Sequence, residues 1–279
     1  TTVRNSGGGT VANGASVNLG TSVYDTAQFY GDIRNEDGTA AVDGTLTYTL
    51  YKGESCDAGF VDDWLVTVTA GEAIPDMPES FQLVEAGTYN FQATFEFNDG
   101  EKDVSISSPC GTETVNVNTR QPSVTTTILV DGAETAPGSR VVRPVSVADR
   151  ADLGGLVDGV TLPSGTVTFS LQKDGAEVWS DTQTITEGTT ATSAAYDLSE
   201  TDYGTYCWVV EFTPADDEQN YTASTSGCAA ETFHLDADPT ITTAMFHSSD
   251  GEGDGSPMAD GAVRTVGDWV RDTATLTGA

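Results

Sequence analysis

The chain has 279 residues and carries 43 Asp and Glu against 11 Lys and Arg, which gives a formal net charge of −32. This charge excludes a nucleic-acid-binding protein that works through a basic patch, because phosphate groups repel an acidic surface. Uninterrupted apolar runs are only a few residues long, which excludes insertion into a membrane. The 37% hydrophobic content, together with 30 glycines, is typical of a globular chain rather than a disordered one.

The chain begins Thr-Thr-Val, with neither an initiator methionine nor a charged and then apolar signal sequence. We therefore expect a mature form or a piece of a longer protein. Four cysteines in an acidic chain with many predicted strands favour an oxidising compartment, and thus an extracellular, secreted or cell-surface location.

Several sequence elements return along the chain at a spacing of about 120 residues, the size of one sandwich domain. The opening residues 1–3 look like the end of a strand that returns at 121–127 and again at 238–243. Four further elements repeat between the first and second parts of the chain, and one of them also returns in the third. These elements are residues 24–29, 148–153 and 271–276; 44–50 and 165–171; 87–89 and 204–206; and 110–115 and 228–233.

The repeats predict three units. Residues 1–119 and 120–236 each form a complete domain, and residues 237–279 carry only the first two strands of a third. Two strands alone are marginally stable in water and leave a sheet edge and an apolar face exposed. We interpret the third unit as the start of a further repeat in a longer array. Donation of this hairpin to another copy of the chain is the alternative.

Within each unit, apolar and polar residues alternate with the period of two that is typical of strands with one buried face. The clearest strands cover residues 89–97 and 206–212, and a second pair covers 46–50 and 167–171. Turns rich in Gly, Pro, Asp and Asn separate the strands, and no stretch of ten or more residues keeps a helical period. The sequence therefore predicts an all-β fold of antiparallel β-sandwiches.

Residues 202–206, Asp-Tyr-Gly-Thr-Tyr, resemble the Asp-x-Gly-x-Tyr corner at the start of strand F in immunoglobulin domains, and residues 85–89 are their counterpart. The expected fold is thus a tandem of immunoglobulin-like antiparallel β-sandwiches. Antibody domains carry a cysteine two residues after this tyrosine. Neither unit does, so the antibody core disulfide is not carried over.

The units also resemble the bacterial Ig-like repeats that occur in tandem in large actinobacterial surface proteins and adhesins. The resemblance implies the role of a stalk or spacer that holds a functional tip away from the cell wall. The matching residues are 44–51 followed by Cys56, 86–89, 107–110 before Glu113, and 163–169.

The four cysteines suggest one disulfide bond in each complete unit. Cys56 and Cys110 are the pair in the first unit. In the second, a hairpin folded about Asp217 places Cys207 nearly opposite Cys228. Each bond would stabilise its unit by roughly 3–4 kcal/mol and resist mechanical and proteolytic unfolding. The alternative is four reduced, buried thiols.

Lysine is scarce, which argues against the intramolecular isopeptide bonds that cross-link other surface domains. Lys52 and Lys173 occupy equivalent positions, but each lies in the turn after its strand, and Lys102 has no counterpart. We therefore expect disulfide bonds rather than isopeptide bonds.

Calcium is the one metal for which the sequence offers candidate ligands, because carboxylate oxygens suit this ion and acidic junctions can stiffen tandem domains. Asp236 and Asp238 flank the second junction, and Asp250, Glu252 and Asp254 alternate with glycines. The alternating acids lack the EF-hand pattern, and the first junction lacks acids. A solvated acidic loop is therefore the favoured interpretation, and no other cofactor is expected.

An aspartate recurs at Asp25, Asp149 and Asp272. These residues could be ligands, but we interpret each as an exposed strand position or a strand-end hydrogen bond. The acids as a whole are expected in loops and on the polar side of the strands, which leaves the apolar side free of charge.

Catalytic motifs are missing from the sequence. It contains no His-Glu-x-x-His motif, nucleophile elbow or Gly-rich phosphate loop, and His234 and His247 lie apart from any site pattern. Acid pairs at 62–63 and 216–218 could support glycoside hydrolysis, but they do not recur between units. We therefore expect a chain without catalytic activity.

Two features could engage sugars. Trp64, Trp179, Trp208 and Trp269 could form a stacking platform, although Trp208 has the core-facing register and the others occupy non-equivalent positions. Residues 220–222, Asn-Tyr-Thr, form an N-glycosylation acceptor pattern.

These features predict a non-catalytic stalk segment of a cell-surface protein or adhesin, whose partners are its neighbouring repeats. Short junctions that contain Pro122 or Pro239 restrict bending, and the charge keeps neighbouring stalks and exposed sheet edges apart. One alternative is a subunit of an extracellular filament that engages other copies through residues 237–279. The other is an adhesive module that binds a glycan or a host surface.

Overall fold

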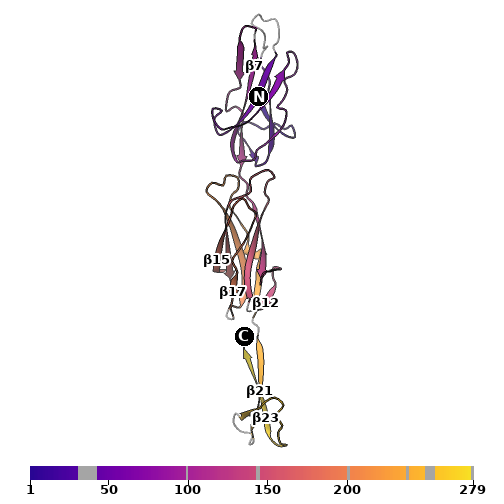
Figure 1. Ribbon diagram of the computed structural model, residues 1–279, viewed down its shortest axis with the longest axis vertical. Helices are drawn as coiled ribbons and strands as arrows, with labels where there is room; N and C mark the ends of the chain where they lie inside the picture. Colours follow the sequence, from indigo (N-terminus) through magenta and orange to yellow (C-terminus); the bar gives the residue numbers. More distant parts are fainter. Residues whose placement is uncertain are drawn as a thin grey trace.

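The computed structural model describes residues 1–30, 43–98, 100–142, 145–199, 202–236, 239–248 and 255–277. Within these ranges the regular structure is β-strand apart from a single 3₁₀ turn at Cys228–Ala230. Two β-sandwiches, called unit 1 and unit 2 below, and then a terminal hairpin follow one another along the long axis of the molecule (Figure 1). Among the described residues there is no helix with the length and hydrophobicity needed to cross a membrane.

Unit 1 consists of two sheets. One has the strand order β1-β3-β6, and the other has the order β2-β9-β7-β4-β5, with β8 also paired to β7. The strands are β1 (Thr2–Asn5), β2 (Ala15–Asn18), β3 (Ser22–Thr26), β4 (Gly44–Lys52), β5 (Phe60–Val68), β6 (Phe81–Gln82), β7 (Gly87–Asn98), β8 (Asp103–Ser107) and β9 (Thr114–Asn118).

Unit 2 repeats this topology with more strands in its first sheet. That sheet has the order β11-β10-β13-β16, with β17 also on β13, and the second has the order β12-β20-β18-β14-β15, with β19 on β18. The strands are β10 (Ser123–Val130), β11 (Ala133–Thr135), β12 (Arg140–Val142), β13 (Val145–Gly154), β14 (Gly165–Lys173), β15 (Ala176–Ile185), β16 (Thr190–Thr192), β17 (Tyr196–Leu198), β18 (Gly204–Pro214), β19 (Ser224–Thr225) and β20 (Thr232–Asp236).

Each unit also contains one parallel strand pair, which the expected antiparallel fold did not include. Strand β2 runs parallel to β9 in unit 1, and β12 runs parallel to β20 in unit 2. The chain leaves the first sheet after β1 in unit 1 and after β11 in unit 2, and it crosses to the second sheet, where it runs alongside the last strand of the unit. This crossing covers the backbone edge that β9 and β20 would otherwise expose.

The strands bury the residues that their alternation predicted. Leu46, Tyr48 and Leu50 are buried on β4, and Tyr206 and Trp208 are buried on β18. The strand segments and the all-β sandwich fold expected from the sequence are therefore confirmed.

Both units contain the tyrosine corner. The Tyr89 hydroxyl donates to the Glu85 carbonyl oxygen at 3.1 Å, and the Tyr206 hydroxyl donates to the Asp202 carbonyl oxygen at 2.5 Å. Each bond ties the start of a long central strand, β7 or β18, to the loop that precedes it, as in immunoglobulin domains.

One disulfide bond is present in each unit. Cys56 is bonded to Cys110 and Cys207 to Cys228, with Cα–Cα distances of 5.9 and 5.3 Å. These are the two pairs expected from the sequence. The first bond joins the loop after β4 to the loop before β9, and the second joins β18 to the 3₁₀ turn ahead of β20.

The terminal hairpin repeats the opening strands of each sandwich. Met245 lies opposite Asp272, as Ile128 lies opposite Asp149 in unit 2. In unit 1 the corresponding pair is Val3 and Asp25. The hairpin consists of β21 (Thr240–Ser248), β22 (Ser256–Pro257) and β23 (Trp269–Thr277), in the order β22-β21-β23.

Candidate functional site: buried acid pairs and the joint between the units

Asp25 lies in the core of unit 1, so it is not an exposed strand position, although it does make the strand-end hydrogen bonds that were the other interpretation. It follows the buried Val23 on the inward side of β3 and is 0% exposed. Its Oδ1 accepts hydrogen bonds from the backbone N–H of Thr2 at 3.2 Å and of Thr26 at 2.7 Å. Beside it lies the carboxyl group of Glu113, which is 6% exposed and is contributed by the opposite sheet.

Unit 2 contains the same pair. Asp149 of β13 is 0% exposed, and its neighbour Glu231, just before β20, is 3% exposed. The glutamates occupy equivalent backbone positions, because the Glu113 carbonyl accepts from Phe91 N–H at 3.0 Å and the Glu231 carbonyl accepts from Trp208 N–H at 3.2 Å. The expectation that the apolar side of the strands carries no acid was therefore also wrong.

Burial is the main cause that raises the pKa of Asp25 to about 8 and the pKa of Asp149 to about 9, and the adjacent glutamate is the second cause. Burial also raises the pKa of Glu113 and of Glu231. Two carboxyl groups in contact in a low-dielectric core cannot both ionise readily. Each pair therefore titrates as a unit, and burial favours a protonated form. In unit 1 the N-terminal ammonium group of Thr1, 3.8 Å from Oε1 of Glu113, opposes this rise in pKa.

The buried oxygen atoms of this pair in unit 2 favour a protonated form. The backbone N–H groups of Thr127 and Arg150 lower the pKa of Asp149. Even so, both carboxyl oxygens of Asp149 and Oε2 of Glu231 lack a partner in good hydrogen-bond geometry among the described residues. A proton on one carboxyl group would supply the donor that the other lacks.

The joint between the units is a second feature that the sequence did not indicate. Asn220 of unit 2 is 8% exposed, and its side-chain oxygen accepts a hydrogen bond from the backbone N–H of Ala86 in unit 1 at 2.9 Å. The backbone of Asn220 is itself fixed, since its carbonyl accepts from Arg120 N–H at 2.8 Å. The glycosylation pattern at 220–222 thus falls on an asparagine whose side chain is committed to the joint.

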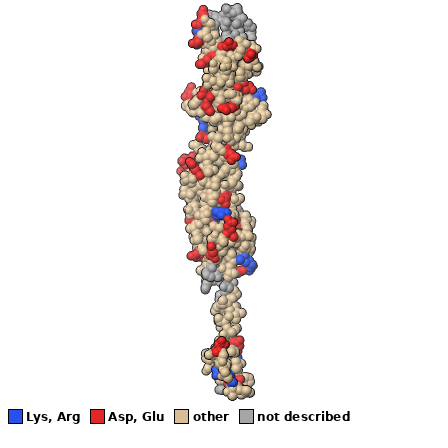
Figure 2. Space-filling model, turned by 45° about the vertical axis from the view of Figure 1, so that its right-hand side comes forward, with Lys and Arg blue, Asp and Glu red and all other residues tan. Residues whose placement is uncertain are grey.

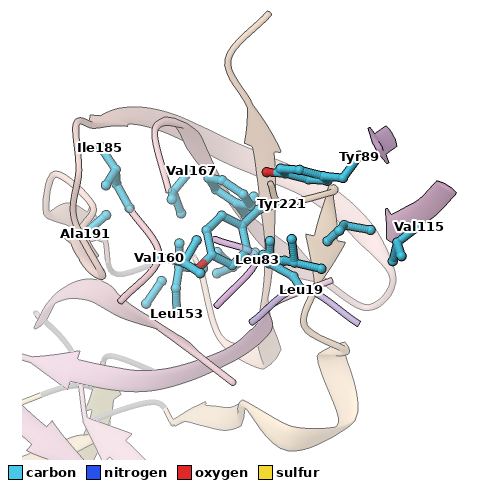
Figure 3. Packing of buried hydrophobic residues seen from close by; sticks show 14 of the residues in the cluster. Leu19, Leu83, Tyr89, Val115, Leu153, Val160, Val167, Ile185, Ala191 and Tyr221 are labelled. Carbon is cyan, nitrogen blue, oxygen red and sulfur yellow. The ribbon is translucent and has the colours of Figure 1, made fainter. Parts of the chain in front are cut away.

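Apolar side chains surround this contact. Tyr221 and Val160 of unit 2 belong to the same buried cluster as Leu19 and Leu83 of unit 1, so the apolar packing continues from one sandwich into the next (Figure 3). Gly20 of unit 1 also lies against the Val157 side chain of unit 2. A Cβ at Gly20 would lie 2.3 Å from Cγ1 of Val157.

Acidic side chains from other parts of the chain lie beside the first junction, although residues 119–122 contain no acid. Glu85, Glu187, Asp217 and Glu218 line a cavity of about 300 Å³ beside Asn220. Glu218 is engaged inside unit 2, where its side chain accepts from Ser164 N–H at 3.1 Å and from Asn220 N–H at 2.8 Å. Within the described ranges, no group of three or more His, Cys, Asp or Glu side chains could hold a metal ion.

Of the candidate calcium ligands at the second junction, only one falls in a described range. Both carboxylate oxygens of Asp236 are bound by the Arg140 guanidinium at 2.6 and 2.7 Å. Asp238, Asp250, Glu252 and Asp254 lie outside the described residues. The calcium site stays a prediction.

The four tryptophans do not share one surface. Trp208 and Trp64 are buried, and the Trp64 indole N–H donates to Glu79 at 3.2 Å. Trp179 packs edge-on against Trp208, with ring centroids 5.8 Å apart. Trp269 is exposed on the terminal hairpin.

The two lysines at equivalent positions each contact another side chain. Lys52 forms an ion pair with Glu85, and Lys173 lies over the Tyr206 ring.

Comparison with known proteins yields little. No protein-family model and no curated protein matches the chain. Among solved structures, a Corynebacterium diphtheriae protein named a "putative membrane anchored protein" is similar, with 13% sequence identity and a TM-score of 0.26. The match covers 84% of this chain and 58% of that one, so this chain spans less than two thirds of its length. A likeness at this level carries no argument about function.

Proposed function

We propose that the chain is a non-catalytic stalk segment of an extracellular protein built from tandem Ig-like repeats, like the bacterial surface repeats it resembles. The joint between the two sandwiches carries this proposal. A buried hydrogen bond from Ala86 to Asn220 and a continuous apolar cluster connect unit 1 to unit 2. Such a connection resists bending, whereas an exposed polar linker leaves domains free to reorient.

Two further features support an extracellular stalk. Disulfide bonds such as those at Cys56–Cys110 and Cys207–Cys228 persist in oxidising compartments. Acidic side chains are spread along the visible face of both sandwiches and of the hairpin (Figure 2). With a net charge of −32, neighbouring stalks on one surface repel each other.

The structure offers less support for a filament assembled through the terminal hairpin. The place that the hairpin would take in another copy is already filled, by β1 and β3 in unit 1 and by β10 and β13 in unit 2. A terminal hairpin that inserted there would displace the native strand pair, so one strand pair would become exposed for each hairpin that is covered. We therefore favour the stalk.

Residual dipolar couplings of the full chain test the proposal. A rigid joint predicts that the couplings of unit 1 and unit 2 fit one alignment tensor. The substitution Asn220→Ala should split this into two tensors, because it leaves the Ala86 N–H buried without an acceptor. Asn18→Ala, which removes an exposed side chain of the same type, should leave one tensor. Two unrelated tensors in the unmodified chain would contradict the stalk.

A further inference from the structure

One face of the terminal hairpin, which we call the hairpin face, matches a buried surface of unit 2 position by position. Strand pairing aligns Thr240 and Thr277 with Ser123 and Gly154, and this register extends along both hairpins. The hairpin face consists of Ile241, Thr243, Met245, His247, Val270, Asp272, Ala274 and Leu276. The matching residues of unit 2 are Val124, Thr126, Ile128, Val130, Val147, Asp149, Ala151 and Leu153.

The two surfaces differ in exposure. In unit 2 the apolar positions Ile128, Val147 and Leu153 are at most 5% exposed. On the hairpin face, Met245 is 45% and Ile241 69% exposed. Asp272 is exposed too, whereas Asp149 is fully buried. A patterned apolar strand pair that remains open to water marks an interaction surface.

Units 1 and 2 show what covers a surface of this design. In unit 2 it is the second sheet, whose strands β14 and β18 turn Val167, Phe169, Trp208 and Val210 into the core. That sheet also presents Glu231, which supplies the other half of the buried acid pair. In unit 1 the corresponding sheet presents Glu113 to Asp25.

We infer that the hairpin face binds a β-sheet of the same design as β20-β18-β14-β15, with an alternating apolar face and one glutamic acid placed beside Asp272, as Glu231 is placed beside Asp149. Asp272 makes the recognition selective. A sheet with an apolar residue opposite it would bury an unpaired carboxyl group, and a sheet with the acid would bury a hydrogen-bonded pair. A second copy of this chain does not provide such a sheet, because the strand pair β1 and β3 already covers this sheet in unit 1 and the pair β10 and β13 covers it in unit 2.

This inference goes beyond the stalk, and it stands on the hairpin alone rather than on the joint. The test fuses a second copy of residues 155–236 directly after Thr277 of the full chain. Thr277 is the fusion point because it has the register position of Gly154, the residue that precedes 155 in unit 2. Hydrogen exchange of the β21 and β23 amides is the readout, and the native units 1 and 2 serve as internal standards. We expect exchange at β21 and β23 to slow by at least about 100-fold relative to the unfused chain.

Two variants of the fused chain distinguish specific pairing of the two acids from non-specific apolar association. Asp272→Lys should return exchange in β21 and β23 to the fast rates of the unfused chain, because it buries a cation opposite the apolar sheet. Replacing the fused copy of Glu231 by Gln should keep the protection, since an amide N–H takes the place of the shared proton. Protection that survives Asp272→Lys would overturn the proposal.

A second experiment covers the case in which the fusion itself misfolds. Residues 240–277 replace residues 123–154 inside unit 2 of the full chain, so that β21 and β23 take the positions of β10 and β13. Retained exchange protection of β14 and β18 supports the proposal, and its loss overturns it. Sedimentation of the unmodified chain as a dimer with β21 and β23 protected would also overturn it, since a second copy would then be the occupant.

Discussion

The carboxyl groups of Asp149 and Glu231 are buried together in the core of unit 2, one from β13 and the other from the residue just before β20. Asp25 and Glu113 make the equivalent contact in unit 1. A protonated pair bonds the two sheets together, and an ionised pair places two like charges in an apolar core. The protonation state of these pairs is therefore linked to the stability of each sandwich.

This linkage predicts that unfolding stability falls as the pH rises. The folded pKa of Asp149 is about 9, well above its ordinary value of 3.8, so between these values the folded state holds a proton that the unfolded state has released. The free energy of unfolding of unit 2 should drop by about 1.4 kcal/mol per pH unit in this window, and that of unit 1 should drop in the same way up to the folded pKa of Asp25, about 8. Urea titrations at pH 5, 7 and 9 measure the slope, and a flat profile would disprove the shared proton.

Asp149→Asn should narrow the pH range over which the stability of unit 2 falls. The amide N–H can donate to Glu231 and removes the neighbouring carboxyl group, so Glu231 keeps only the rise in pKa that its burial causes. Amide exchange in β18 as a function of pH reports on unit 2 alone. Asp197→Asn is the matched control, because its side chain is exposed, and it should retain the slope. If Asp149→Asn keeps the full slope as well, another group is responsible.

The strands could be predicted from sequence because their signal is local. The same alternation that placed Trp208 in the core also places Asp149 on the buried side, in step with Val147 and Ala151. The sequence interpretation of Asp149 was an exposed strand position or a strand-end hydrogen bond, and neither includes a buried acid partner. Its partner Glu231 lies far along the chain, and only the folded sandwich brings the two together. The repetition of both acids in each unit was the available signal.

The joint could not be predicted for a related reason. It forms where the loop containing Val157 and Asp158 and the loop containing Asn220 meet Leu83 and its neighbours in unit 1. None of these loops has a periodic pattern, and their meeting depends on how one sandwich is placed on the next. Pro122, which the sequence pointed to, lies in the connecting segment and is buried there.

Removal of the disulfide bonds should destabilise the two units to different extents. The Cys207–Cys228 bond spans 21 residues and the Cys56–Cys110 bond spans 54. Loop-closure entropy then predicts losses of about 3 and about 4 kcal/mol for the respective double Cys→Ala variants. Urea unfolding monitored by amide exchange in β18 and in β7 separates the two effects. Equal stability with and without a bond would mean that it does not constrain the unfolded chain.

The close approach of Gly20 to Val157 gives a test of the joint that leaves both cores untouched. Gly20 has a φ of +85°, and a Cβ there would lie 2.3 Å from Cγ1 of Val157. Gly14 has a similar φ of +73°, but nothing lies within 4 Å of its Cβ position. Alanine at either site should destabilise unit 1 by about 1–2 kcal/mol through backbone strain.

Only Gly20→Ala should also push the units apart. We expect its small-angle scattering profile and dipolar couplings to show two independently oriented sandwiches, whereas Gly14→Ala keeps the single alignment of the unmodified chain. Adding Val157→Ala to Gly20→Ala removes the atom that the new methyl group meets and should restore part of the alignment. If both glycine variants behave alike, strain within unit 1 accounts for the effect and the contact with Val157 does not hold the joint.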